Sequence, residues 1–132
     1  MALWFGSLRN PDDPKRKQLY FIRLKTQKPM FFGALAQVHH GLDPHDGDGF
    51  VIITAASDQG MVDIHDRKPL VLTPEHAREW IDPSLTPARA EEIAKECCQP
   101  VEDFEWYAVG KAVGSVKNHG ADLLLPVPCK DV

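Results

Sequence analysis

The stretch Phe50-Val-Ile-Ile-Thr-Ala-Ala-Ser-Asp-Gln-Gly-Met-Val-Asp-Ile-His-Asp-Arg-Lys-Pro-Leu-Val-Leu72 decides how the rest of the chain is arranged. It contains two apolar runs rich in β-branched residues, 50–56 and 70–72, and this pattern predicts two buried strands. The polar connection between them places His65 between two aspartates and close to Arg67. Because strands hold side chains rigidly and histidine titrates near neutral pH, we look for chemistry first in this connection.

The flanking segments also carry strand patterns. Residues 19–24 and 30–36 are apolar runs separated by a turn at 26–29, which predicts a hairpin. Gly33 inside the second run predicts a bulge or a close approach of two backbones. Further along, apolar and polar residues alternate over 104–109, which predicts another strand, and 123–127 is predicted to be a last short strand.

Two helices are predicted between these strands. Each begins with the pair Thr-Pro, at 73–74 and at 86–87, which places a capping hydroxyl before a proline in the first turn. The first helix is expected to end near Ile81, because Asp82-Pro83 follows. The second carries apolar residues at helical spacing up to Cys97, which we expect to be a packed thiol. The elements together predict an α+β domain, mostly antiparallel, with a few covering helices.

Length and composition indicate one ordinary domain. The chain has 132 residues, of which 43% are hydrophobic and 26% charged, enough for a single core. No apolar run is long enough to span a bilayer and the first residues lack a signal-peptide pattern, so we expect a cytoplasmic protein without a membrane partner. Its three cysteines include no Cys-x-x-Cys pair, so they indicate neither a zinc site nor a redox pair.

Charge is unevenly distributed. The formal net charge is −4, yet residues 1–28 contain seven basic side chains and only two acidic ones. A basic segment on an acidic protein either faces phosphates or is a solvated loop, and the pattern alone favours the loop.

The segment 39–49 is rich in histidine and aspartate, which raises the question of a metal. Its aspartates do not have EF-hand spacing and it lacks the terminal glutamate of that loop. His39 and His40 are adjacent and would point apart on a strand. We therefore expect a flexible loop, no metal site and no cofactor.

Three interpretations of the residues around His65 remain open. A hydrolase triad with Ser57 is disfavoured because the chain has no Gly-x-Ser-x-Gly elbow. A structural role, with Arg67 paired to a neighbouring aspartate, is favoured by residue types alone. The third is a phosphate or nucleic-acid pocket in which His65 is the acid–base group, Arg67 binds a phosphate, and Thr54 or Asn118 is a neutral donor.

A resemblance changes that balance. The runs Thr54-Ala55-Ala56 and Val62-Asp63-Ile64-His65-Asp66-Arg67 resemble the hallmark of the SOS response-associated peptidase (SRAP) family. The later runs 112–118 and 124–127 resemble the closing motif of that family. The similar motifs occur in the same order from about Trp4 to Val127.

The resemblance implies a function and a set of site residues. SRAP proteins act on abasic sites in single-stranded DNA during the SOS response, where an amino-terminal cysteine forms a thiazolidine crosslink with the sugar aldehyde, and an associated autopeptidase activity is implied. It implies that His65 is catalytic and that Arg67 contacts a DNA phosphate. We expect Thr54, Lys117 and Asn118 to be further DNA-binding residues. The implied fold is a distorted, β-barrel-like α+β domain.

The chain departs from the family pattern at its start. Ala2 stands where the family has cysteine, Leu3 precedes Trp4 where the family has glutamate, and the segment that carries the asparagine of the pocket has no counterpart. We expect residues 1–128 to be the carboxy-terminal half of an SRAP domain, 129–132 to be a tail, and no stable crosslink to form.

Two further expectations concern partners. Half of a domain leaves an open strand edge and an apolar face, which predicts pairing between copies. The alternative function is a non-enzymatic, phage-related module that binds nucleic acid or protein through the basic segment 9–28, and such binding should weaken steeply with salt.

Overall fold

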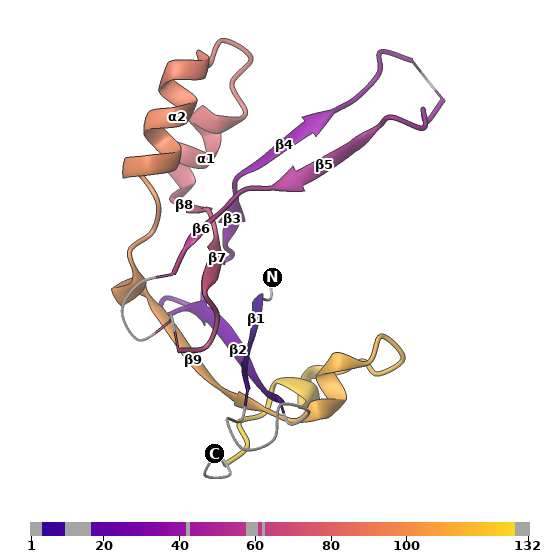
Figure 1. Ribbon diagram of the computed structural model, residues 1–132, viewed down its shortest axis with the longest axis vertical. Helices are drawn as coiled ribbons and strands as arrows, with labels where there is room; N and C mark the ends of the chain where they lie inside the picture. The colour runs from indigo at the N-terminus through magenta and orange to yellow at the C-terminus, as the bar shows by residue number, and fades with distance from the viewer. Residues whose placement is uncertain (1–3, 10–16, 42, 58–60, 62, 129–132) are drawn as a thin grey trace. The chain divides into compact units, whose positions relative to one another are not determined.

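The computed structural model describes residues 4–9, 17–41, 43–57, 61 and 63–128 (Figure 1). The chain forms two compact units. The first unit comprises residues 1–29, 57–66 and 100–132, and the second comprises 30–56 and 67–99. Every strand ladder in the described ranges is antiparallel and two α-helices accompany them. The predicted α+β class, mostly antiparallel, is therefore confirmed.

The first unit is built on a three-stranded sheet. Its order is β1 (Trp4–Arg9), β2 (Lys17–Leu24) and β9 (Phe104–Val109), so β2 is the central strand. Phe21 and Ile22 are adjacent on β2 and are both almost fully buried. Because neighbouring strand residues point to opposite faces, the centre of β2 is covered on both sides. The predicted strand 104–109 is confirmed.

The carboxy-terminal part of the first unit corrects one prediction. Residues 123–127 do not form a strand: Ala121–Leu124 is a 3₁₀ helix (η4), and beyond it Val127 donates its N–H to the carbonyl of Ala108 at 2.9 Å. Gly120, at φ 127°, turns the chain into η4, and Pro126 has no N–H for a ladder. The hydroxyl of Tyr107 donates to the carbonyl of Leu124 at 3.0 Å and fixes η4 to β9.

The second unit contains three two-stranded ribbons in place of longer strands. They are β3 (Phe31–Phe32) with β8 (Val71–Leu72), β4 (Ala34–Gln37) with β5 (Gly49–Ile52), and β6 (Thr54–Ala56) with β7 (Arg67–Pro69). The predicted hairpin between 19–24 and 30–36 is wrong, because β2 pairs with β1 and β9 while β3 and β4 pair with β8 and β5. The runs 30–36 and 50–56, predicted as single strands, are each interrupted.

The interruptions occur where three chain segments meet. Gly33 donates its N–H to the carbonyl of Leu70 (2.8 Å), Leu70 donates to Ile53 (2.8 Å), and Ile53 donates to Gly33 (2.9 Å). The three backbones thus form a closed ring of hydrogen bonds, and the ribbons diverge from it. A Cβ on Gly33 would lie 2.7 Å from Cδ2 of Leu70, so the predicted close approach of two backbones is confirmed.

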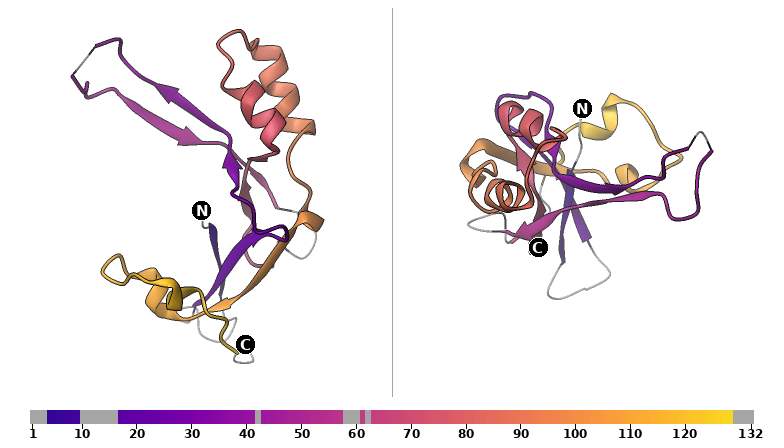
Figure 2. Two further views of the ribbon diagram at one scale, coloured as in Figure 1. Left: turned by 180° about the vertical axis from the view of Figure 1, so that it is seen from behind. Right: turned by 90° about the horizontal axis from the view of Figure 1, so that it is seen from above.

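Two helices cover one part of the second unit. In α1 (Pro74–Trp80) and α2 (Pro87–Glu96), the hydroxyls of Thr73 and Thr86 accept the N–H of the residue three positions later, as the Thr-Pro pairs predict. The C-cap of α1 is Ile81, where the sequence predicts its end. Figures 1 and 2 show the two helices side by side.

A small core joins these helices to the ribbons. Its buried members are Leu70, Leu72 and Ile93, and half-buried side chains pack around them, including Trp80 and Cys97. The expectation that Cys97 is a packed thiol agrees with this position. Arg89 of α2 binds the Glu79 carboxylate of α1 at 2.6 Å, and this hydrogen bond holds the pKa of Glu79 below its ordinary value.

Burial differs between the two apolar runs of residues 50–72. Residues 70–72 are buried, as predicted. The run 50–56 is not: Phe50 is 71% exposed, Val51 63% and Ile52 44%. The apolar pattern correctly predicts β structure there, but burial depends on a covering layer that the described residues do not supply.

We predict that Gly33→Ala destabilises the second unit by about 1–3 kcal/mol, because the added methyl overlaps the buried Leu70 side chain. Chemical denaturation followed by circular dichroism measures the change. Gly49→Ala is the matched control, since nothing lies within 4 Å of its Cβ position, and its effect should stay within about 1 kcal/mol. Equal effects of the two substitutions would show that the ring at Gly33 is not tightly packed.

Candidate functional site

The structure brings together two residues that the sequence analysis assigns to DNA binding, Thr54 and Arg67. Ribbon β6–β7 pairs Ala56 with Arg67, so Thr54, two residues from Ala56, lies on the same face as the arginine. The Nε of Arg67 donates to Thr54 Oγ1 at 2.9 Å, and Nη2 donates to Oγ1 at 2.7 Å and to the Thr54 carbonyl at 2.9 Å. Three hydrogen bonds therefore orient this exposed guanidinium.

The acceptors in this contact are a hydroxyl and a carbonyl, neither of which carries a formal charge. The contact therefore orients the Arg67 guanidinium. Arg23 and Arg89 are oriented by carboxylates, that of Glu105 at 2.6 Å and that of Glu79. An oriented guanidinium suits recognition of a phosphate, for which arginine offers a planar fork of donors.

His65 lies in the first unit, on a turn anchored by buried apolar side chains. The N–H groups of Ile64 and His65 both donate to the carbonyl of Met61 at 3.1 Å. Met61 and Ile64 are buried, whereas the His65 side chain is 42% exposed. Its Nδ1 lies 3.2 Å from a carboxylate oxygen of Asp66, which favours the tautomer that carries its proton on Nδ1. The imidazole is thus oriented and accessible.

The hydrolase interpretation receives no support at Ser57. Its hydroxyl is buried and has no hydrogen-bond partner in the part of the chain that the structure describes. A nucleophilic serine needs a base within hydrogen-bond distance and access to substrate. The backbone of Ser57 instead donates to the carbonyl of Asp66 at 2.9 Å, so this residue helps to hold the turn that carries His65.

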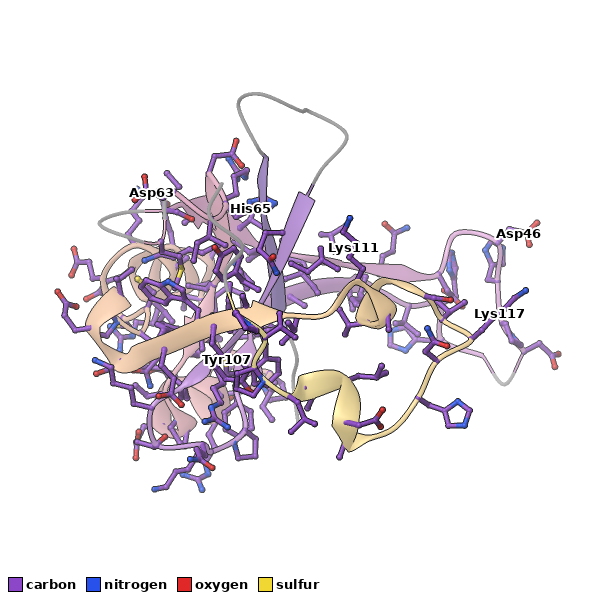
Figure 3. The ribbon with its side chains drawn as sticks, turned by 90° about the horizontal axis from the view of Figure 1, so that it is seen from below. Asp46, Asp63, His65, Tyr107, Lys111 and Lys117 are labelled. Atoms are coloured by element: carbon purple, nitrogen blue, oxygen red, sulfur yellow. The ribbon has the colours of Figure 1, made fainter. Side chains whose placement is uncertain are left out.

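Lys117 and Asn118, also predicted to bind DNA, lie in the loop between η3 (Lys111–Gly114) and η4. The Asn118 amide donates to the carbonyl of Ala112 at 2.9 Å, so it closes the loop. Lys117 is exposed, and Figure 3 shows it well separated from His65 within the first unit. The structure therefore does not gather Lys117 into the surroundings of His65.

The loop between β4 and β5 contains a local cluster that sequence reasoning missed. Asp48 accepts the N–H of His39 (2.8 Å) and of His45 (2.9 Å), and the His39 and His45 rings stack at 3.9 Å. Hydrogen bonds from His45 and His39 hold the pKa of Asp48 below its ordinary value. The sequence feature that predicts such a cluster is Asp48 between two glycines, because an aspartate in a turn accepts hydrogen bonds from nearby backbone N–H groups.

Across the described ranges, no group of three His, Cys, Asp or Glu side chains is arranged to hold a metal ion. Helices in the same ranges are all too short or too polar to cross a membrane.

A comparison with known families places the chain. The sequence model described as SOS response associated peptidase (SRAP) matches residues 4–116. The chain belongs to the SRAP family. The resemblance noted in the motifs around His65 is thereby confirmed over most of the sequence.

The chain spans about half the length of the curated relatives it matches. The abasic site processing protein YedK of Escherichia coli is 44% identical over 124 residues, which cover 94% of this chain and 54% of YedK. The abasic site processing protein YoqW of Bacillus subtilis is 32% identical over 114 residues, 85% of this chain and 50% of YoqW. The crystal structure of a phage-related protein from Bordetella bronchiseptica aligns with a TM-score of 0.71 at 38% identity, covering 84% of this chain and 51% of that one.

We predict that Asn118→Ala and Lys117→Ala have different structural effects. Loss of the Asn118 amide opens the loop, because its hydrogen bond to Ala112 is a side-chain contact that spans it. Amide hydrogen exchange in residues 111–118 should speed up severalfold in this variant. It should be unchanged in Lys117→Ala, the matched control one residue away, and faster exchange in both would contradict the assigned role.

Proposed function

We propose that this chain contributes the DNA-binding and proton-transferring residues of an abasic site processing protein. The observation that carries the proposal is the Thr54–Arg67 contact, which orients a guanidinium on the β6–β7 ribbon. Membership of the SRAP family supports it, as do the names of relatives such as YedK. The proposed ligand is single-stranded DNA that contains an abasic site, handled in the response to DNA damage.

In this proposal Arg67 binds a phosphate. The guanidinium is already oriented by Thr54, so less conformational entropy is lost when a phosphate oxygen is bound. Phosphate contacts set position and orientation and carry little sequence information. That property suits a protein that must recognise a missing base in any sequence.

His65 is proposed to move a proton on the abasic sugar. The closed sugar is a hemiacetal. It opens to the aldehyde when the C1′ hydroxyl loses a proton, the bond between C1′ and the ring oxygen breaks, and the ring oxygen gains a proton. The exposed imidazole of His65 can accept the first proton and deliver one to the ring oxygen. The carboxylate of Asp66 at 3.2 Å fixes the ring for this role.

The covalent crosslink that SRAP proteins are expected to form requires an amine and a thiol on one residue. Cys97 and Cys98 are internal and half-buried free thiols, so neither carries an α-amine. We therefore assign no step of the crosslink to them. The function proposed for the described residues is binding of the DNA and opening of the sugar.

The alternative, a non-enzymatic module that binds through the basic segment 9–28, has less support. Arg23 of that segment is paired with Glu105 and lies over the rings of Phe21 and Tyr107, so it has a structural role. Residues 10–16, where other basic side chains of the segment occur, lie outside the described ranges. If Lys25→Ala with Lys28→Ala weakened DNA binding more than Arg67→Ala, the alternative would be preferred.

We predict that Arg67→Ala weakens binding to abasic single-stranded DNA about tenfold and lowers the slope of log affinity against log salt by about 1. Fluorescence anisotropy over a salt series measures both quantities. Thr54→Val should weaken binding by a smaller factor with the slope unchanged, because the arginine keeps its charge and loses two of the three hydrogen bonds that orient it. Lys95→Ala on α2 removes a cation paired with Glu91 and is the matched control. If Lys95→Ala and Arg67→Ala had equal effects, the phosphate assignment would fail.

We predict that His65→Gln leaves DNA affinity within about twofold but abolishes any acceleration of sugar opening. A glutamine amide forms hydrogen bonds but does not act as an acid or a base at neutral pH. Capture of the aldehyde by a hydroxylamine probe in excess reports the opening rate. Asp66→Asn, which keeps the imidazole but removes its carboxylate partner, should lower the rate partially. An unchanged capture rate in His65→Gln would refute the role of His65.

A further inference from the structure

The ribbon formed by β4 and β5 exposes more large apolar side chains than any other element among the described residues. Within residues 34–38 and 49–52, here called the apolar ribbon, Leu35 is 58% exposed and Val38 is 68% exposed. Phe50, Val51 and Ile52 are exposed as well, and the ribbon contains no charged residue. Figures 1 and 2 show β4 and β5 extending away from α1 and α2 within the second unit.

Both faces of the apolar ribbon are apolar. The register pairs Leu35 with Val51 and Ala36 with Phe50. Paired residues share a face and successive pairs alternate, so Val51 and Phe50 lie on opposite faces. An isolated two-stranded ribbon is marginally stable in water, and exposed apolar patches of this kind mark an interface. A structure that buries this ribbon must cover it on both sides.

A groove in the same unit continues this surface. It has a volume of about 380 Å³ and lies between β3, β8 and α1. Its lining is mostly apolar, including Phe31, Phe32 and Trp80, with Arg78 as the charged member. Phe31 is 44% exposed and Ile81 is 77% exposed. The indole N–H of Trp80 donates to the carbonyl of Ala34, the first residue of β4, at 3.0 Å. The groove and the ribbon are therefore adjacent parts of one apolar surface.

Two occupants are conceivable for this surface, and their geometry differs. A second copy that adds its strands to the edge of the ribbon covers neither face. A second copy that stacks its ribbon on this one covers a single face, because a twofold contact uses the same patch on both chains. A separate layer of chain can cover both faces and also fill the groove. The SRAP relatives contain further sequence that could form this layer, because the segment they share with this protein is only 54% of YedK and 51% of the Bordetella protein.

We propose that the apolar ribbon and the adjacent groove are the docking surface for the portion of an SRAP domain that lies outside this shared segment. That portion binds whether it is on the same polypeptide or on a separate one, because the contact is a non-covalent apolar interface. Phe50 anchors one face and Val51 the other. The inference concerns assembly of the domain and does not depend on the proposed DNA chemistry.

The test is reassembly from two polypeptides. The 132-residue chain is mixed with the portion of E. coli YedK outside the 124-residue match, and size-exclusion chromatography with light scattering is expected to show a one-to-one complex. YedK divided at the same boundary is the positive control. If the two parts of YedK reassemble and this chain does not bind the YedK portion, the proposal is overturned.

Single substitutions on each face identify the occupant. Phe50→Asp and Val51→Asp are each expected to weaken the complex at least tenfold, because both faces are covered. Val116→Asp is the matched control, since Val116 is fully exposed and lies in the other unit, and it should leave affinity unchanged. If the chain forms a homodimer that only one of the two ribbon substitutions disrupts, a second copy is the occupant and the proposal fails.

Hydrogen exchange provides a measurement that does not rely on the variants being folded. Amides of β4 and β5 in the unsubstituted chain are expected to exchange at least tenfold more slowly when the YedK portion is added, while those of η3 change little. Protection restricted to other elements would overturn the assignment of the docking surface.

Discussion

The ring of three hydrogen bonds among Gly33, Ile53 and Leu70 is the constraint on which the second unit depends. Each residue donates to one partner and accepts from another, so the backbone groups that meet there satisfy one another. Every strand that reaches the ring must leave in a new direction, which produces three short ribbons in place of one sheet. One ribbon packs against the helices, one carries Thr54 and Arg67, and one is the apolar ribbon.

Three arginine side chains join neighbouring elements through hydrogen bonds. Arg23 and Arg89 bind glutamates that neutralise them, and they join β2 to β9 and α1 to α2. Arg67 joins β7 to β6 through its hydrogen bonds to Thr54, which fix the direction of the guanidinium.

Local chemistry made some of this structure predictable. The Thr-Pro pairs predict both helix starts, because capping and the fixed φ of proline act within one turn. Alternation predicts β9, and Gly33 predicts a close approach. The breaks at Gly33 and Ile53 were not predictable, since the apolar pattern is the same on both sides of each break. The exposure of residues 50–52 was also not predictable, because hydrophobicity indicates that burial would stabilise a segment and not whether other residues cover it.

The candidate site is less predictable from local sequence than the helices are. Composition alone favoured a structural His65, and only the family motif singled it out with Arg67. The contact between Arg67 and Thr54 depends on the β6–β7 register, which brings together residues 13 positions apart. This register is determined by the pairing of the two strands along their whole length, so it cannot be predicted from a short stretch of sequence.

The pairing of β2 with β9 sets an order of events during synthesis. Ile22 lies opposite Trp106, so β2, the central strand of the first unit, pairs with a strand near the other end of the chain. The second unit uses residues 30–56 and 67–99, all of which leave the ribosome before β9 does. Because the translating ribosome releases the chain from its amino terminus, the ribbons and helices can form while β2 is still unpaired on one edge. This edge of β2 therefore stays unpaired by β9 for the time needed to translate the intervening residues.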